Sequence, residues 1–156
     1  MADSSILLGA PCSFVGDPVG NVNCHPVSMS EKPYDIRERT YLFARESVAF
    51  GRYAVTLRDF VLNRLVYQLV DAAGSAGANL EEAADGQSKP DFINKNCIAL
   101  KEIREAKFWL RQLRDAEPTK LGPATAPLIN EAEELRLIVT TIILNAKASQ
   151  SRGKET

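Results

Sequence analysis

A heptad repeat of mostly apolar residues in the third quarter of the chain limits its possible folds more than any other feature. These residues alternate by four and three positions, so they return to one side of an α-helix. A helix of this kind needs partner helices along its whole length. The pattern therefore predicts a helical bundle, and its members are Phe92, Asn96, Ala99, Ile103, Ala106, Leu110 and Leu113.

Two helices are predicted before this segment. The first begins at about Tyr34, and Gly51 loosens its pattern after four or five turns. Thr56 and Asp59 resemble a capping box that begins the second helix. Its end is predicted at Asp85 and Gly86, where a turn dipeptide follows a run of small residues. The expected buried positions are Ile36, Thr40, Phe43, Ser47 and Phe50 in the first helix, and Val61, Leu65, Leu69, Ala72 and Ala76 in the second.

The third and fourth helices have clear start signals. Ser88 precedes Pro90 and Asp91, a combination that suits the first turn of a helix. Pro118, Gly122 and Pro123 separate this helix from the last one. The fourth helix repeats the same rhythm after these breakers, through Leu128, Ala132, Leu135, Val139, Ile142 and Ala146.

Short connections between four helices favour an all-α, antiparallel up-down-up-down four-helix bundle. We expect this bundle to span residues 34–148 as the one domain of a chain of 156 residues. Residues 1–33 are rich in Gly and Pro and are predicted to form an irregular N-terminal tail. The last stretch, 149–156, is predicted to be a disordered C-terminus.

Charge and cysteine content favour a cytoplasmic protein without a strong overall field. Nineteen Lys and Arg against twenty Asp and Glu give a formal net charge of −1, so binding to nucleic acid would require a local stripe of cations. The three cysteines (Cys12, Cys24 and Cys97) are odd in number and widely spaced, which fits reduced thiols. No apolar run is long enough to span a membrane, and we expect no membrane partner.

Catalytic and metal-binding interpretations find little support. The single histidine, His25, lies near Cys12 and Cys24, but these make three ligands where a structural zinc site uses four. A di-iron bundle would need Glu-x-x-His pairs within its helices. Glutamates such as Glu102 and Glu105 have no activated nucleophile beside them. We therefore expect no enzyme, no catalytic residues, no metal and no cofactor.

One local stripe of cations is present in the third helix. Arg104, Lys107, Arg111 and Arg114 fall within a narrow arc beside the apolar seam. We name this set the cationic ladder and consider it a candidate RNA-binding site, because such a row can follow a phosphate backbone. The alternative is a solvated flank whose charges pair with nearby glutamates.

A second set of apolar residues points away from the predicted core. Phe60 and Tyr67 in the second helix, Phe108 in the third, and Leu137 and Leu144 in the fourth lie opposite their own seams. Lone exposed apolar residues are ordinary. Three helices that show the same feature favour a self-association surface, so these five residues form a candidate oligomer interface.

The motif around the third helix resembles the 23S rRNA intervening sequence proteins, a family of four-helix bundles. The resemblance covers about residues 34–147. It is most specific at Gly77-Ala78-Asn79, Glu82-Ala83, Gln87-Ser88-Lys89, Asp91-Phe92-Ile93, Lys95, Ile98-Ala99-Leu100-Lys101-Glu102, Glu105 and Trp109-Leu110.

The resemblance implies a small cytoplasmic bacterial protein that assembles into a homopentameric ring. A weaker similarity, centred on Phe108-Trp109-Leu110-Arg111, extends to the accessory bundle proteins of diversity-generating retroelements, which bind a reverse transcriptase. Asp71 stands where the family usually has a basic residue, which weakens an RNA-binding role for that face. The segment before Ser30 has no counterpart in the family.

Five motif positions are expected to have structural roles, although Asn79, Glu82 and Ser88 could instead contact a partner. Asn79 can satisfy backbone groups and Ser88 can cap a helix, while Trp109 suits a core or interface position. The family-motif residues are Asn79, Glu82, Ser88, Asp91 and Trp109. Two functions remain open: an RNA- or ribonucleoprotein-associated assembly, and an adaptor ring that docks a partner enzyme such as a reverse transcriptase.

Overall fold

Four long helices account for most of the described chain. The computed structural model describes the backbone of residues 12–16, 22–26 and 35–152, and the side chains of residues 35–151. The helices are α1 (Ile36–Val55), α2 (Phe60–Ala84), α3 (Lys89–Ala116) and α4 (Pro118–Arg152). Two short strands, β1 (Cys12–Gly16) and β2 (Val22–Pro26), precede them. None of the described helices is long and apolar enough to cross a membrane.

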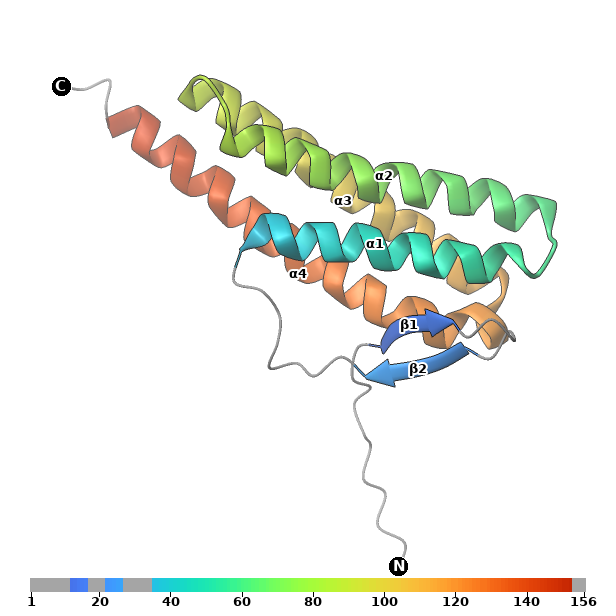
Figure 1. Cartoon of the computed structure of the whole chain (residues 1–156). Coiled ribbons are helices and arrows are strands. Elements are labelled where there is room, and N and C mark those ends of the chain that lie inside the picture. The colour runs from blue at the N-terminus through green and yellow to red at the C-terminus, as the bar shows by residue number, and fades with distance from the viewer. Residues whose placement is uncertain (1–11, 17–21, 27–34, 153–156) are drawn as a thin grey trace, which may run out of the picture.

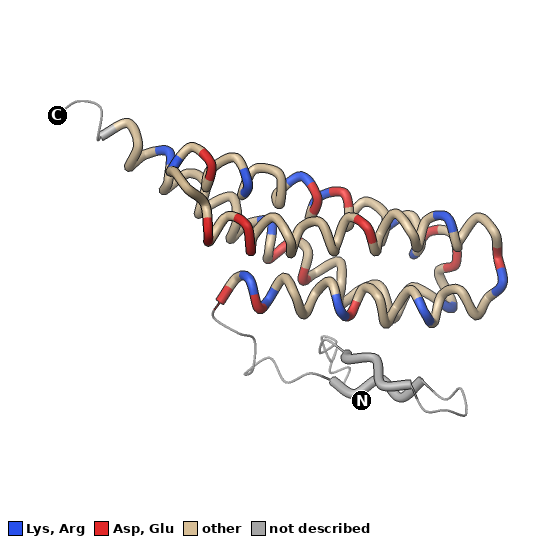
Figure 2. The backbone as a smooth tube through the Cα atoms, turned by 45° about the horizontal axis from the view of Figure 1, so that its top comes forward, with Lys and Arg blue, Asp and Glu red and all other residues tan. Residues whose placement is uncertain are grey.

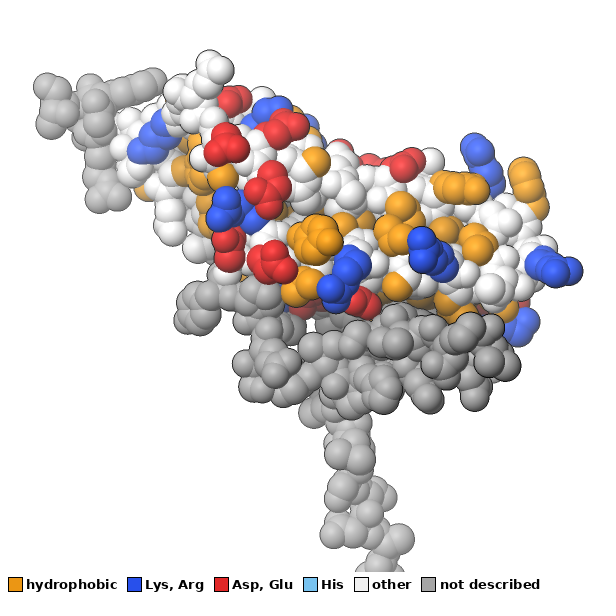
Figure 3. Space-filling view, in the orientation of Figure 1, with side chains coloured by type: hydrophobic (Ala, Val, Ile, Leu, Met, Phe, Trp, Pro, Cys, Tyr) orange, Lys and Arg blue, Asp and Glu red, His pale blue; other side chains and the backbone are white. Residues whose placement is uncertain are grey.

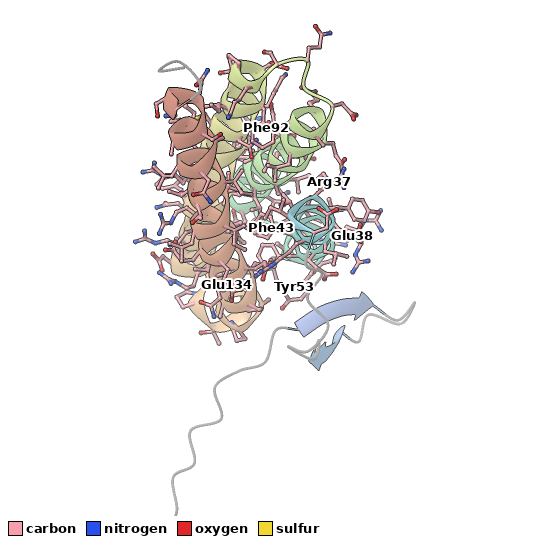
Figure 4. All side chains as sticks on the ribbon, turned by 90° about the vertical axis from the view of Figure 1, so that its left-hand side faces the viewer. Arg37, Glu38, Phe43, Tyr53, Phe92 and Glu134 are labelled. Atoms are coloured by element: carbon pink, nitrogen blue, oxygen red, sulfur yellow. The ribbon has the colours of Figure 1, made fainter. Side chains whose placement is uncertain are left out.

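The helices run up, down, up and down, as predicted, and form a four-helix bundle (Figure 1). Helix α1 packs against α2 and α4, and α3 also packs against α2 and α4. This pattern places α2 and α4 at opposite corners of the bundle. Figure 4 shows Phe43 between the helices, whereas Arg37 and Glu38 point away from the core.

The seam of α3 matches its prediction closely. Asn96, Ala99, Ile103, Ala106, Leu110 and Leu113 are all buried. At the start of the helix, Ile93 replaces Phe92 as the buried residue. Asn96 satisfies its own amide by donating from Nδ2 to the backbone oxygen of Phe92 at 2.8 Å. An amide can therefore occupy this core position without losing a hydrogen bond.

The predicted register of α2 is wrong in its first half. Val61 is 63% exposed, and Leu62 and Val66 are the buried residues instead. Both sets are apolar at helical spacing, so the local pattern does not distinguish them. Packing against α1 and α3 decides which set is buried, and Leu69, Ala72 and Ala76 are buried as predicted.

The predicted capping box is also wrong, because its two residues belong to different helices. Asp59 is the N-cap of α2, and its Oδ1 accepts from the backbone nitrogens of Val61 at 2.7 Å and Leu62 at 3.0 Å. Thr56 is the C-cap of α1. Between these caps, Arg58 adopts a positive φ of 56°.

Glycine and proline interrupt the helices less than the sequence suggests. Helix α1 continues through Gly51 to Val55, because Gly51 is buried against Val66 of α2. Helix α4 begins at Pro118 and contains Pro123 and Pro127. Proline removes a helical hydrogen bond, but here the surrounding turns bury Leu121, Ala124, Thr125 and Leu128 against the bundle.

Both ends of the chain differ from expectation. The N-terminal segment is not irregular throughout, because β1 and β2 pair antiparallel with Phe14 opposite Cys24, and β1 contacts α1. An isolated two-stranded sheet is marginal in water, so contact with a helix is the support that such a pair needs. At the other end, residues 149–152 are helical rather than disordered. The remainder of both predicted segments lies outside the described residues.

Candidate binding surfaces

The cationic ladder lies along α3, but two of its four members are neutralised by neighbours. Nζ of Lys107 lies 2.7 Å from Oε2 of Glu133 in α4. Nε of Arg114 lies 2.8 Å from Oδ1 of Asp115, which raises the pKa of Arg114 through a side-chain hydrogen bond. The ladder is therefore partly the paired flank that the sequence left as an alternative.

Arg104 and Arg111 are the members that can still bind a ligand through unpaired charge. Both side chains are exposed. Neither makes an ion pair with another residue within 35–151. They are seven residues apart, so they lie on the same side of α3, about two turns from each other. Figure 2 shows acidic and basic residues interspersed along all four helices, so this pair is a local feature.

Glu133 joins α3 to α4 by accepting from two cations. Arg136 donates to it from Nη2 at 2.6 Å and from Nε at 2.9 Å, and Lys107 donates from Nζ at 2.7 Å. The hydrogen bond from Arg136, followed by that from Lys107, lowers the pKa of Glu133 from its ordinary value of 4.5 to about 2. This carboxylate is therefore charged at any physiological pH.

A second group of charges, which the sequence did not reveal, joins α1 to α4. Arg39 forms ion pairs with Glu131 and Glu134, and its side chain is only 12% exposed. Its Nη2 donates to Oε2 of Glu131 at 3.0 Å. Glu134 projects from α4 toward α1 in Figure 4. No local sequence pattern could reveal this group, because Arg39 lies more than ninety positions before its two glutamates.

The five candidate interface residues are all exposed. The exposed fraction is 78% for Phe60, 63% for Tyr67, 50% for Phe108, 52% for Leu137 and 62% for Leu144. Within each of α2 and α4 the two residues are seven positions apart and share one side of the helix. Because α2 and α4 occupy opposite corners, these pairs form two separate apolar patches that face away from each other. Whether they form an interface stays a prediction.

A third apolar row lies on α1 and was missed by the sequence analysis. Tyr41, Val48 and Val55 are 57%, 40% and 37% exposed. They recur every seven residues, and this spacing was the signal that could have revealed them. We call these three residues the α1 stripe.

Two motif residues near the end of α2 make contacts within the fold. Nδ2 of Asn79 donates to the backbone oxygen of Ser75 at 2.9 Å. Glu82 forms an ion pair with Lys95 of α3, and the hydrogen bond that Lys95 donates to this carboxylate raises the pKa of Lys95. Helix α2 stays continuous here, so Asn79 supports an intact helix rather than a break.

The other three motif residues have similar roles in α3. Oγ of Ser88 accepts from the backbone nitrogen of Asp91 at 3.3 Å and so caps the helix, as expected. Trp109 donates from Nε1 to Oε1 of Glu105 at 3.1 Å. Its ring meets that of Phe108 edge to face, with centroids 4.9 Å apart. Trp109 is partly buried against the core, where its indole is held in place by these contacts.

Candidate metal ligands are not brought together among the described side chains. Across residues 35–151, no three His, Cys, Asp or Glu side chains are grouped as metal ligands. Cys97 is a free thiol of intermediate burial. The alternative zinc ligands Cys12, Cys24 and His25 lie outside the residues with described side chains.

Comparisons with known proteins identify relatives of unknown function. The family model of the 23S rRNA-intervening sequence protein matches residues 35–141. A solved structure from Bacteroides thetaiotaomicron VPI-5482, a protein with unknown function from the S23 ribosomal protein family, is 31% identical. The match covers 70% of this chain and 98% of that one, with a TM-score of 0.62. No curated protein matches this sequence.

Proposed function

Because the chain belongs to the 23S rRNA-intervening sequence protein family, we propose that it is a non-enzymatic, cytoplasmic bundle that assembles into a closed ring and associates with RNA. The observation that supports assembly most directly is the pair of exposed apolar patches on opposite corners of the bundle. Phe60 and Tyr67 form the patch on α2, and Leu137 and Leu144 form the patch on α4.

Two different patches favour a head-to-tail contact. In such a contact the α2 patch of one copy packs on the α4 patch of the next, and the series closes when the rotation between copies divides a full turn. A homopentamer is the ring that the family resemblance implies. Phe108 lies on α3, which packs against both patched helices, and its exposed ring is a third apolar contact that a neighbouring copy could cover.

Variants that each disable one of the two patches test this arrangement. Tyr67→Glu should disable only the α2 patch, and Leu137→Glu only the α4 patch, because each places an unpaired charge in an apolar contact. Each variant alone should be monomeric, while an equimolar mixture should form a 1:1 heterodimer joined through the two intact patches. Sedimentation velocity and light scattering would measure these masses.

The control is Val61→Glu, which alters an exposed apolar residue about 100° around α2 from Phe60 and should leave the ring intact. Self-dimers of either single variant would indicate a symmetric contact of like patches. A wild-type chain that is monomeric at high micromolar concentration would contradict assembly altogether.

The proposed RNA association depends on Arg104 and Arg111, together with the relationship to rRNA that the family's name records. A ring would repeat this pair once in each subunit, and multivalency can convert a weak patch into a useful binding surface. Both arginines are exposed and neither makes an ion pair with another described residue, so they can contact phosphates without first breaking one.

Binding to a fluorescent, structured RNA hairpin would test this step. We expect affinity to weaken steeply between about 50 and 200 mM salt, since binding releases counterions from the phosphates. The double variant Arg104→Glu with Arg111→Glu should bind the RNA at least tenfold more weakly. The double variant Lys101→Glu with Lys120→Glu makes the same change in net charge outside the ladder, and it should bind the RNA more tightly than the first double variant. Full affinity in the first double variant would exclude the ladder, and an intact wild-type ring without RNA binding would favour the adaptor function.

A further inference from the structure

The outer side of α1 combines apolar residues with arginines in a regular order. The α1 stripe recurs at seven-residue intervals, and Arg45 and Arg52 follow its first two members by four positions each. Arg45 and Arg52 are exposed. Figure 3 shows apolar side chains along the face made by α1 and α2, with basic side chains beside them.

This spacing is that of a helix–helix contact rather than of a nucleic-acid track. Tyr41, Val48 and Val55 span about 21 Å of helix, at a rise of about 1.5 Å per residue. Residues at heptad spacing stay against a partner helix that crosses at a small angle, whereas surfaces for single-stranded nucleic acid combine a basic groove with aromatic rings on which successive bases stack. Val48 and Val55 have no aromatic face, so the stripe suits a helix.

The flanking charges define which helix would fit. Arg52 makes no ion pair with any other described side chain, and Arg58, in the connection to α2, makes none within the same residues. Among the described side chains, Arg45 pairs only with its neighbour Glu46, at 2.8 Å, an exposed contact of small value. A partner helix with acidic residues beside its apolar row would supply a counter-charge to Arg52 and could replace Glu46 as the partner of Arg45, as residues flanking the seam do in coiled coils.

From these features we propose that the α1 stripe, with Arg45 and Arg52, is a docking site for an amphipathic helix of a partner protein that carries acidic residues beside its apolar row. The α1 stripe shares no residue with the α2 and α4 patches proposed for ring assembly. The partner helix lies along α1, its apolar row meets Tyr41, Val48 and Val55, and its carboxylates pair with the two arginines.

The test uses three designed helical peptides of three heptads each and the full-length protein. All three have the same length, and two have identical Leu and Ile seams, one with Glu at every flanking position and the other with Lys. The third keeps the Glu residues but has a scrambled seam. Fluorescence anisotropy should show that the Glu peptide binds at least tenfold more tightly than either control peptide.

Variants of the α1 residues then test whether the peptide binds at the α1 stripe. Val48→Ser removes one apolar contact without adding charge and should weaken the Glu peptide at least fivefold. Arg45→Glu with Arg52→Glu should reverse the preference, so that the Lys peptide binds better than the Glu peptide. Val61→Ser and Lys101→Glu are matched controls on α2 and α3 that should leave binding unchanged. Circular dichroism would confirm that each variant remains folded.

The outcomes separate this proposal from ring assembly. Leu137→Glu should retain the Glu peptide's affinity even when it breaks the ring. The proposal is overturned if the Glu peptide does not bind, or if charge reversal leaves the preference for the Glu peptide unchanged. It is also overturned if single-stranded RNA displaces the Glu peptide and binds the Val48→Ser variant more weakly than the wild type. The last result would assign the surface to nucleic acid.

Discussion

Gly51 of α1 and Val66 of α2 lie so close that a Cβ atom added to Gly51 would be 2.9 Å from Cγ1 of Val66. Real Cβ atoms essentially never come this near to another atom, so any larger residue must displace α2 or the valine. Val66 is buried and β-branched, and its side chain has little freedom to move aside. The glycine is therefore a packing requirement between the first two helices.

We expect Gly51→Ala to destabilise the fold by about 1 kcal/mol, because overpacking costs about 1–3 kcal/mol and the gain in helix propensity returns about 1 kcal/mol. Gly74→Ala is the matched control, since a Cβ there would meet nothing within 4 Å. It should stabilise by about 1 kcal/mol. Urea unfolding of both variants would measure the two changes, and a gain at Gly51 would show that the helices can separate freely.

Leu110→Ala should lower the free energy of unfolding by about 2–5 kcal/mol, as a large-to-small change in a core does. Leu110 is fully buried in the seam of α3. Leu137→Ala provides the comparison for an exposed leucine, and its effect should stay near 0.5 kcal/mol. Chemical denaturation of each variant, with concentration held fixed because of assembly, would decide whether the register is right.

Asp59→Ala should cost about 1 kcal/mol of stability, because it removes the acceptor for two backbone nitrogens at the start of α2. Thr56→Ala should cost less, since Oγ1 of Thr56 only donates to the backbone oxygen of Tyr53, at 2.7 Å, where α1 ends. Thermal melts of the two variants would compare them. Equal losses would favour the capping box expected from the sequence.

The pKa of Glu133 gives a prediction about pH. Its value in the folded protein is about 2, below the ordinary 4.5, so the unfolded state takes up its proton first as the pH falls. The contribution of this group to stability is therefore complete above about pH 4.5 and is lost as the pH falls toward 2. Carboxyl NMR titration should show this low value directly.

Removing its partners should raise the pKa of Glu133 in a defined order. Arg136→Met should raise it more than Lys107→Met, because the hydrogen bond from Arg136 is the largest cause of the shift. Equal titration of Glu133 in the wild type and both variants would contradict the contacts between α3 and α4.

Local sequence alone determined the helices and most of the α3 seam, because helix caps and heptad spacing depend on residues a few positions apart. Ser88 and the run from Asn96 to Leu113 are examples, and the family resemblance rests on the same segment and is confirmed. The exposed outer positions, such as Tyr67 and Leu144, followed from the same periodicity.

Only the tertiary structure decided which of several equivalent local patterns is buried and which charges remain available. Leu62 rather than Val61 enters the core, and Gly51 continues a helix, because neighbouring helices supply the packing. Arg39 finds its partners across more than ninety residues, and Lys107 is neutralised from α4. Burial and charge pairing depend on atoms that are distant along the chain, and their positions are fixed only when all four helices have packed together.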